Sequence, residues 1–98
     1  MLIFHIVLPR DWDAFEGDEY SSASLAAEGF IHCSYAHQLD AVIERYYDGA
    51  ESLVLLTVDT GQMGARLVEE PSTGGEVYPH IYGTIRRSEI VGVETREI

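Results

Sequence analysis

Apolar runs about as long as a β-strand recur along the chain, separated by glycine, proline and acidic residues. The first run covers residues 2–8 and is interrupted only by His5. A continuous run of this kind is typical of a strand that is buried on both faces. Further extended segments are expected at residues 30–34, 52–58, 66–70, 77–83, 85–86 and 90–93.

One segment has helical periodicity over more than two turns. The spacing i, i+3, i+4, i+7, i+8 is filled by Leu39, Val42, Ile43, Tyr46 and Tyr47. This apolar stripe predicts a principal helix over residues 36–47. Ser34 is a candidate cap at its start, and Gly49 is a candidate stop at its end.

Two shorter helices are expected, one at residues 10–15 and one from a cap at Ser22 or Ser24 through Glu28 to a stop at Gly29. Repeated right-handed β-α-β units need more helix than these segments supply. The pattern therefore predicts an α+β fold with a largely antiparallel sheet, formed by a single domain over residues 1–98.

Charge narrows the range of partners. Asp and Glu number 17, all six basic residues are arginine, and the formal net charge is -11. Such a field repels phosphate backbones and anionic lipids, so we expect neither general nucleic-acid binding nor membrane binding. The apolar runs are shorter than the roughly 20 residues of a membrane span. The N-terminal segment lacks the basic region and cleavage site of a signal peptide, so a cytoplasmic location is expected.

Cysteine and histidine spacing argues against a metal site. Cys33 is the sole cysteine, which excludes an internal disulfide and a four-cysteine zinc module. His5, His32 and His80 match no compact ligand motif such as H-E-x-x-H. We therefore expect that the purified protein holds no stoichiometric zinc.

Two apolar segments in the N-terminal half of the chain contain polar side chains. His5 is either a buried histidine satisfied by hydrogen bonds or a functional residue, because a polar group in an apolar strand otherwise costs stability. Phe30, His32 and Ser34 share one face of the second predicted strand, directly before the principal helix. Ser34 is accordingly a helix cap, a pocket residue, or both.

A third segment combines aromatic rings with an imidazole. Tyr78, His80 and Tyr82 alternate along an extended stretch and so share one face. They form either the aromatic rim of a small core or a wall that stacks on a flat ligand.

Several motifs together resemble one bacterial family, the domain-of-unknown-function family 952. The motifs are Ile-Phe-His-Ile at 3–6, Trp12, Ser24-Leu25, Glu-Gly-Phe-Ile-His-Cys-Ser at 28–34 and Pro-His-Ile-Tyr-Gly at 79–83. The fold that this resemblance implies is similar to that of ADP-ribosyltransferases, and especially to that of RNA 2′-phosphotransferases, which use NAD. The implied architecture is a small split antiparallel sheet with one principal helix.

The same resemblance implies roles for individual residues. His5 would act catalytically against a ribose hydroxyl, and Glu70 or Glu28 would supply a carboxylate that stabilises an oxocarbenium ion. The cofactor-binding residues would be His32, Ser34, His80 and Tyr82. Glu28 stands where the phosphotransferases carry an arginine, which disfavours transfer of an RNA phosphate.

Three functions are consistent with these features. The first is a binding module whose His-, Ser- and Tyr-lined pocket holds a nucleotide or small metabolite, with NAD as a possible cofactor. The alternative is an NAD-dependent transferase or hydrolase of the ADP-ribosyl type. A second alternative is a protein–protein adaptor that uses an acidic face.

Overall fold

The computed structural model describes the backbone of residues 1–98 and every side chain except that of Thr73. The strands are β1 (Leu2–Val7), β2 (Glu19–Tyr20), β3 (Ile31–His32), β4 (Ser52–Asp59), β5 (Arg66–Pro71), β6 (Val77–Tyr82), β7 (Ile85–Arg86) and β8 (Ile90–Glu97). The α-helices are α1 (Pro9–Ala14), α2 (Ala23–Glu28) and α3 (Leu39–Tyr46). Short 3₁₀ turns cover Ala36–Gln38, Thr60–Gln62, Thr73–Gly75 and Arg87–Glu89.

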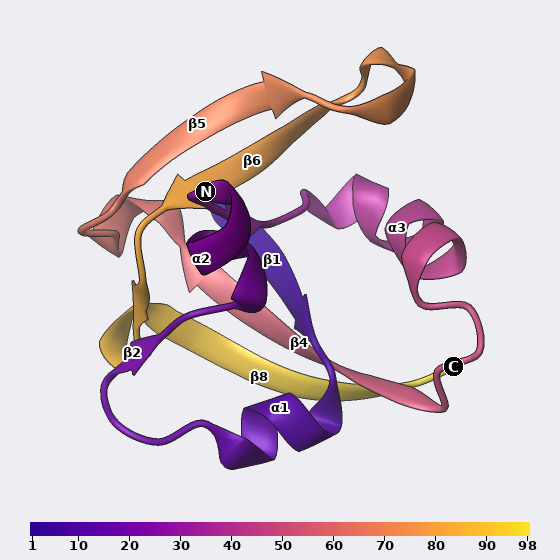
Figure 1. Cartoon of the computed structure of the whole chain (residues 1–98), viewed down its shortest axis with the longest axis horizontal. Helices are drawn as coiled ribbons and strands as arrows, with labels where there is room; N and C mark the ends of the chain where they lie inside the picture. The colour runs from indigo at the N-terminus through magenta and orange to yellow at the C-terminus, as the bar shows by residue number, and fades with distance from the viewer.

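The strands pair in an antiparallel manner and form a split sheet, which confirms the predicted α+β class with antiparallel sheets. One three-stranded sheet has the order β1-β4-β8, another has the order β3-β6-β5, and β2 pairs with β7. In Figure 1 the β5–β6 hairpin and the β4–β8 ladder lie at opposite ends of the molecule, with β1 between them. A backbone bridge between Phe4 and Ser34 links β1 to the segment that follows β3.

β4 separates two apolar clusters because its successive side chains point to opposite faces. Leu53 and Leu55 pack with Leu39 and Ile43 of α3 on one face. The alternate residues of β4 face a larger cluster, whose buried members are Ile3, Val7, Tyr20, Ile31, Cys33, Val54, Leu56, Val58, Ile81 and Ile85. The continuous apolar run at 52–58 therefore reflects burial on both faces, as its sequence predicts.

The principal helix starts differently from the prediction. Residues Ala36–Gln38 form a 3₁₀ turn, and the α-helix runs from Leu39 to Tyr46. Ser34 does not cap it, because the Ser34 backbone is paired with Phe4 through two hydrogen bonds of 2.8 Å. The buried Gln38 fixes the turn instead, since its Oε1 accepts from the Tyr35 N–H at 2.9 Å. Its Nε2 donates to the Val77 carbonyl at 2.8 Å and ties the turn to β6.

Strand lengths also differ from the expected ones at two places. The regular ladder of β3 covers only Ile31–His32, because the chain turns at Cys33 to pair with Pro79 and then at Ser34 to pair with Phe4. The last strand is longer than residues 90–93 and runs to Glu97. Its second half is exposed and polar, so it has no apolar alternation to reveal it.

The buried carboxylate of Glu89 fixes the turn between β7 and β8. It is 3% exposed and accepts from the backbone N–H groups of Gly64, at 2.7 Å, and Arg86, at 2.8 Å. Arg86 Nε also donates to it, at 3.2 Å. The carboxylate thereby satisfies two backbone donors that the turn leaves without a carbonyl partner.

Replacing Glu89 with Ala should lower the free energy of unfolding by about 2 kcal/mol, because two part-buried backbone N–H groups lose their acceptor. Urea denaturation followed by circular dichroism measures this change. Ser88→Ala, at an exposed position of the same turn, is the control and should stay within about 0.5 kcal/mol of wild type. A Glu89→Ala protein as stable as this control would contradict the assigned role.

Candidate functional site

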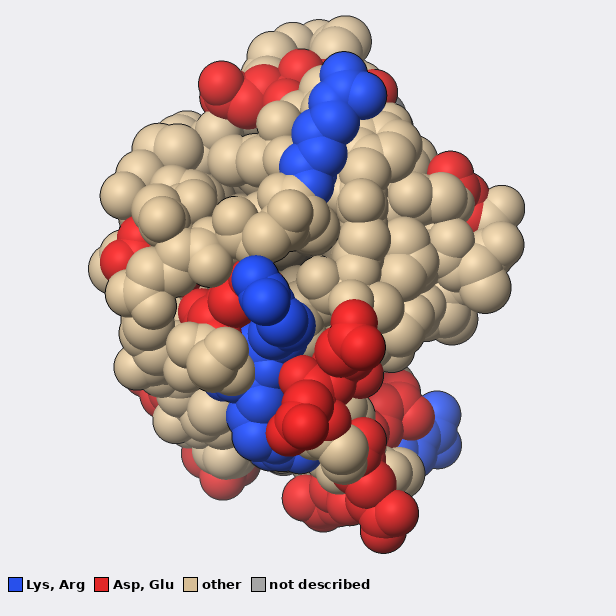
Figure 2. Space-filling model, turned by 90° about the vertical axis from the view of Figure 1, so that its left-hand side faces the viewer, with Lys and Arg blue, Asp and Glu red and all other residues tan. Residues whose placement is uncertain are grey.

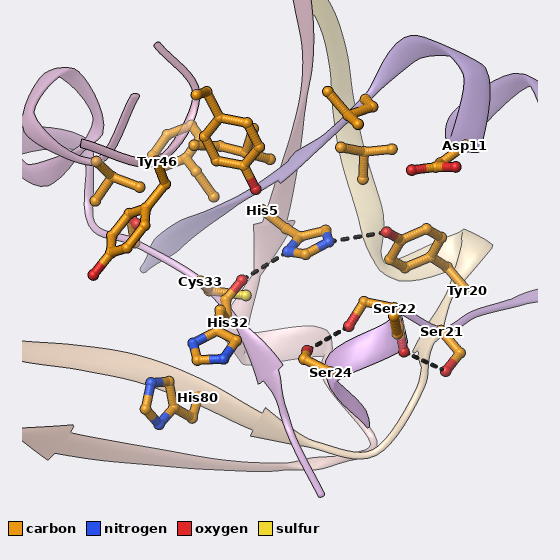
Figure 3. A pocket seen from close by; sticks show the side chains of 18 of the residues that line it. His5, Asp11, Tyr20, Ser21, Ser22, Ser24, His32, Cys33, Tyr46 and His80 are labelled. Atoms are coloured by element: carbon orange, nitrogen blue, oxygen red, sulfur yellow. Dashed lines mark hydrogen bonds between the residues drawn. The ribbon is translucent and has the colours of Figure 1, made fainter. Parts of the chain in front are cut away.

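A pocket of about 800 Å³ opens between β1, β3, β6 and the three α-helices. Figure 3 shows that side chains from the N-terminal strand, the serine-rich segment before α2, and the β3–β6 ladder converge on it. Such a volume lies in the range of sites that enclose small metabolites. The split between the sheets therefore leaves a space that a ligand can occupy.

The pocket lining is rich in hydroxyl groups and aromatic rings and poor in charge. The serines are Ser21, Ser22, Ser24, Ser34 and Ser72, and the aromatic residues are Phe4, Phe15, Tyr20, Tyr46, Tyr47 and Tyr78. Asp11 is the sole carboxylate among the lining residues, and none of them is Lys or Arg. This lining offers stacking surfaces and neutral hydrogen-bond groups but no cation for a phosphate.

His5 lies at the back of the pocket and is satisfied by the protein. Its Nδ1 lies 2.7 Å from the His32 carbonyl oxygen, and its Nε2 lies 3.0 Å from the Tyr20 hydroxyl. A carbonyl only accepts, so Nδ1 carries the proton and Nε2 accepts from Tyr20. Burial lowers the pKa of His5 to about 4, which keeps the ring neutral near pH 7.

His32 and His80 face one another on neighbouring strands. They are register partners of the β3–β6 ladder, and their ring centroids are 5.2 Å apart. Phe30 stacks on His80 with centroids 4.2 Å apart and planes within 19°. Both histidines line the pocket, and Figure 3 shows their rings side by side at its edge, below His5.

Each of these two histidines is paired with a carboxylate. His32 Nε2 lies 2.7 Å from a Glu28 oxygen, and His80 Nδ1 lies 2.8 Å from Glu70 Oε1. The same Glu70 oxygen accepts from the Tyr82 hydroxyl at 2.6 Å. The hydrogen bonds from Tyr82 and then from His80 lower the pKa of Glu70, so that it stays ionised.

The structure brings four of the six sequence-predicted site residues to one pocket. His5, His32, Ser34 and His80 line it. Tyr82 does not: it lies at a second, shallower hollow with Glu19 and Arg86. Glu70 is not a lining residue either, and contacts the site through His80. Tyr82 donates to the same Glu70 oxygen that His80 contacts.

Sequence reasoning missed much of the lining. The segment Ser21-Ser22-Ala23-Ser24 was expected only to supply a helix cap. Ser22 does precede α2, but its hydroxyl bonds to that of Ser24 at 2.7 Å and caps no backbone N–H. Three serines within four residues exceed what one helix cap requires, and this excess is the signal that could have indicated a polar wall.

Cys33 also lines the pocket, and its surroundings make it inert. It is 3% exposed, and burial raises the pKa of its thiol well above the usual value. Among the described residues, no group of three or more His, Cys, Asp or Glu side chains is placed to hold a metal ion. The expectation about zinc stays a prediction, to be checked by elemental analysis. No described helix is long and apolar enough to cross a membrane.

The lowered pKa of His5 predicts how stability depends on pH. The unfolded chain takes up a proton at His5 near pH 6.5, whereas the folded protein does so only near pH 4. Stability from this group is therefore complete above pH 6.5 and is lost as pH falls toward 4. Between pH 7 and pH 5 the loss should be about 2 kcal/mol, measured by urea denaturation at both values.

His5→Asn is the matched variant for this measurement. It should remove the loss between pH 7 and pH 5, because no titratable group remains at that position. The carboxylates with lowered pKa values, Glu70 and Glu89, titrate below this window. An unchanged pH dependence in His5→Asn would show that another group is responsible.

Comparisons with known proteins agree with this architecture. A crystal structure of the Caulobacter crescentus protein CC0527 is 33% identical, with a TM-score of 0.86 over 97% of this chain and 85% of that chain. A crystal structure of a double mutant of CC0527 gives 34% identity and a TM-score of 0.85, with the same coverage. A solution structure of CC0527 gives 35% identity and a TM-score of 0.78 over 95% of this chain and 82% of that chain.

A search of curated proteins finds no match. The family model described as "Protein of unknown function (DUF952)" matches residues 6–93. That match covers most of the chain, and the chain therefore belongs to the DUF952 family.

Proposed function

We propose that the protein binds an uncharged, hydroxylated small molecule with a flat ring, of the nucleoside type, in the pocket behind His32 and His80. The observation that carries the proposal is the lining: five serines and six aromatic residues, with no Lys or Arg among them. Neutral hydroxyl groups of a ligand exchange hydrogen bonds with serine and tyrosine hydroxyls at little electrostatic cost. A phosphate would enter this space without a cation to balance it.

The aromatic side chains of the pocket would bind the flat ring of the ligand. Tyr46 of α3 and Tyr78 of β6 both line the pocket. Tyr46 is 60% exposed, so its ring contributes little packing to the core and remains accessible to a ligand. Tyrosine rings stack on flat heterocycles and on the apolar faces of sugars. The pocket therefore suits a base or ring at one side and a hydroxylated sugar at the other.

The expected likeness to ADP-ribosyltransferases stays a prediction, and it makes NAD a ligand to be tested. The nicotinamide and ribose parts of NAD fit the lining, whereas its pyrophosphate does not. Two arginines contact rings of the lining without lining the pocket themselves: Arg87 lies 4.3 Å from the Phe15 ring centre and donates to the Gly17 carbonyl, and Arg45 lies 6.0 Å from the Tyr46 ring centre. On the face drawn in Figure 2, blue arginine side chains lie close to red carboxylates.

This charge distribution supports a binding module over an ADP-ribosyl-type transferase or hydrolase. The catalytic roles of His5 and Glu70 stay predictions of the resemblance. His5 has both ring nitrogens engaged by the protein, and Glu70 is held by His80 and Tyr82. His5 therefore has no free ring nitrogen for a ligand, and Glu70 does not line the pocket.

Adenosine should raise the melting temperature and shift amide NMR signals of β1, β3 and α3, since ligand binding stabilises the folded state. AMP, ADP-ribose and NAD at the same concentrations should do so far more weakly. Tyr46→Ala should weaken adenosine binding about tenfold, because one stacking contact of roughly 1 kcal/mol is lost. Glu44→Ala, an exposed change on the same helix outside the pocket, is the matched control.

Two results would contradict the proposal. One is tighter binding of NAD or AMP than of adenosine, which would show that the pocket tolerates phosphate. The other is equal adenosine binding by the Tyr46→Ala and Glu44→Ala proteins, which would show that the ligand does not contact Tyr46.

A further inference from the structure

We propose that the backbone of β1 at Ile6 and Leu8 binds the rim of the ligand's flat ring, and that this ring carries an N–H donor next to an acceptor, as adenine does. The inference rests on the proposed function, because it takes a flat ring in this pocket as given. It goes further by naming the backbone atoms that the ring contacts and the hydrogen-bond pattern that selects the base.

The backbone groups of β1 alternate between the two sides of the strand. In an antiparallel ladder, the N–H and the carbonyl of one residue point to the same side, and those of the next residue point to the other. Phe4 exchanges two hydrogen bonds of 2.8 Å with Ser34, so its backbone groups point away from β4. Further along the strand, both groups of Ile6 and then the N–H of Leu8 point the same way.

The pairing between β1 and the segment after β3 ends with this single bridge. In the register of the bridge, His32 stands opposite Ile6. The His32 carbonyl accepts instead from His5 Nδ1 at 2.7 Å, and β3 pairs with β6. Within the described residues, the Ile6 N–H, the Ile6 carbonyl and the Leu8 N–H make no hydrogen bond to the protein. β1 therefore keeps an open row of a donor, an acceptor and a donor.

This open row faces the pocket. Ile6 and Leu8 both line it, and Ile6 is 8% exposed. Nearly all buried backbone N–H and carbonyl groups in folded proteins have a hydrogen-bond partner. Backbone groups that lack a protein partner at the wall of a pocket are therefore available to a ligand.

The protein closes both ends of the open row. The bridge between Phe4 and Ser34 closes one end. At the other end α1 begins, and the Leu8 carbonyl accepts from the N–H groups of Asp11 at 3.0 Å and Trp12 at 3.1 Å. A peptide that adds a strand to a sheet pairs along a longer edge than this one. The open row is matched in length by the rim of a single planar ring.

A ring that is bound edge-on to β1 lies between aromatic side chains. Successive side chains of β1 point to opposite faces, so Ile6 packs with the cluster under α3, whereas His5 bonds to Tyr20 on the other face. Tyr46 of α3 and Tyr20 both line the pocket, and Figure 3 shows them on opposite sides of His5. Both faces of the ring would thus meet aromatic side chains while its rim meets β1.

The pattern of the row selects the base. The amino group of adenine donates to the Ile6 carbonyl, and the ring nitrogen beside that amino group accepts from the Leu8 N–H. Both contacts are neutral, which agrees with a lining that contains no Lys or Arg. A ring without the amino group leaves the carbonyl unpaired, and a site built to bind such a group discriminates against an analogue that lacks it.

Purine riboside tests the contact with the Ile6 carbonyl, because it differs from adenosine only in lacking the amino group. We expect wild-type protein to bind it about tenfold more weakly than adenosine in calorimetric titrations, since one hydrogen bond is lost. Equal affinity for the two nucleosides would overturn the inference.

Leu8→Pro tests the contact with the Leu8 N–H. Leu8 has a φ of -69° and a ψ of 142°, which proline adopts without strain, and its N–H has no protein partner to lose. Leu8→Ala is the matched comparison, because it loses the same side chain and keeps the N–H. Adenosine should bind Leu8→Pro about tenfold more weakly than Leu8→Ala. Equal binding by these two variants would contradict the assigned donor.

Amide hydrogen exchange, followed by NMR, tests the open row in the wild-type protein. In the free protein the Ile6 and Leu8 amides should exchange faster than the Val7 amide, which points toward β4 in the ladder. Saturating adenosine should slow exchange of the Leu8 amide. A Leu8 amide that is protected as strongly as that of Val7 without ligand would show that the row is not open.

The outcomes separate this inference from the proposed function. If adenosine binds and Tyr46→Ala weakens its binding, but purine riboside binds as tightly, the edge contact is wrong and the proposed pocket stands. If adenosine does not bind at all, both are wrong.

Discussion

The bridge between Phe4 and Ser34 holds the two halves of the molecule together. Its two 2.8 Å hydrogen bonds connect β1, the edge of the first sheet, to the segment that leaves β3 of the second. His5 reinforces it one residue further along, through its bonds to the His32 carbonyl and to Tyr20 of β2. One short stretch of β1 thus contacts all three sheets, and the pocket is the space that this junction leaves open.

The parts of the fold that depend on burial could be predicted from the sequence. β1 and β4 are largely buried on both faces, and their largely apolar runs reveal them. β8 is an edge strand, and only its first part was predicted; the pairing of residues 94–97 is made by backbone atoms, which the side-chain pattern does not reveal. Likewise, the start of α3 depends on Gln38 reaching across to β6, a contact between residues 39 positions apart in the chain. Local patterns carry no information about such a partner.

Most of the predicted site residues do line the pocket, but the sequence did not indicate which of them lie outside it. Alternation along β6 places Tyr78, His80 and Tyr82 on one face of that strand. Tyr78 and His80 line the pocket, whereas Tyr82 lies at the second hollow and donates to Glu70. Glu70 lies on β5, so its contacts depend on how β5 pairs with β6 and cannot be read from the sequence of β6 alone. The scarcity of basic residues, by contrast, is visible in the composition. The pocket lining shares this scarcity, since none of its residues is Lys or Arg.

The burial of Cys33 has a practical consequence for experiments on this molecule. The chain contains one cysteine, and its thiol is shielded and held in the protonated form. A maleimide reacts by attack of a thiolate on its double bond, so Cys33 should stay unmodified in the folded state. A single cysteine introduced at the exposed Ser72, on the pocket rim, would then take up a fluorescent dye selectively in the otherwise wild-type sequence. Such a dye, attached beside the pocket, would make ligand binding measurable by fluorescence.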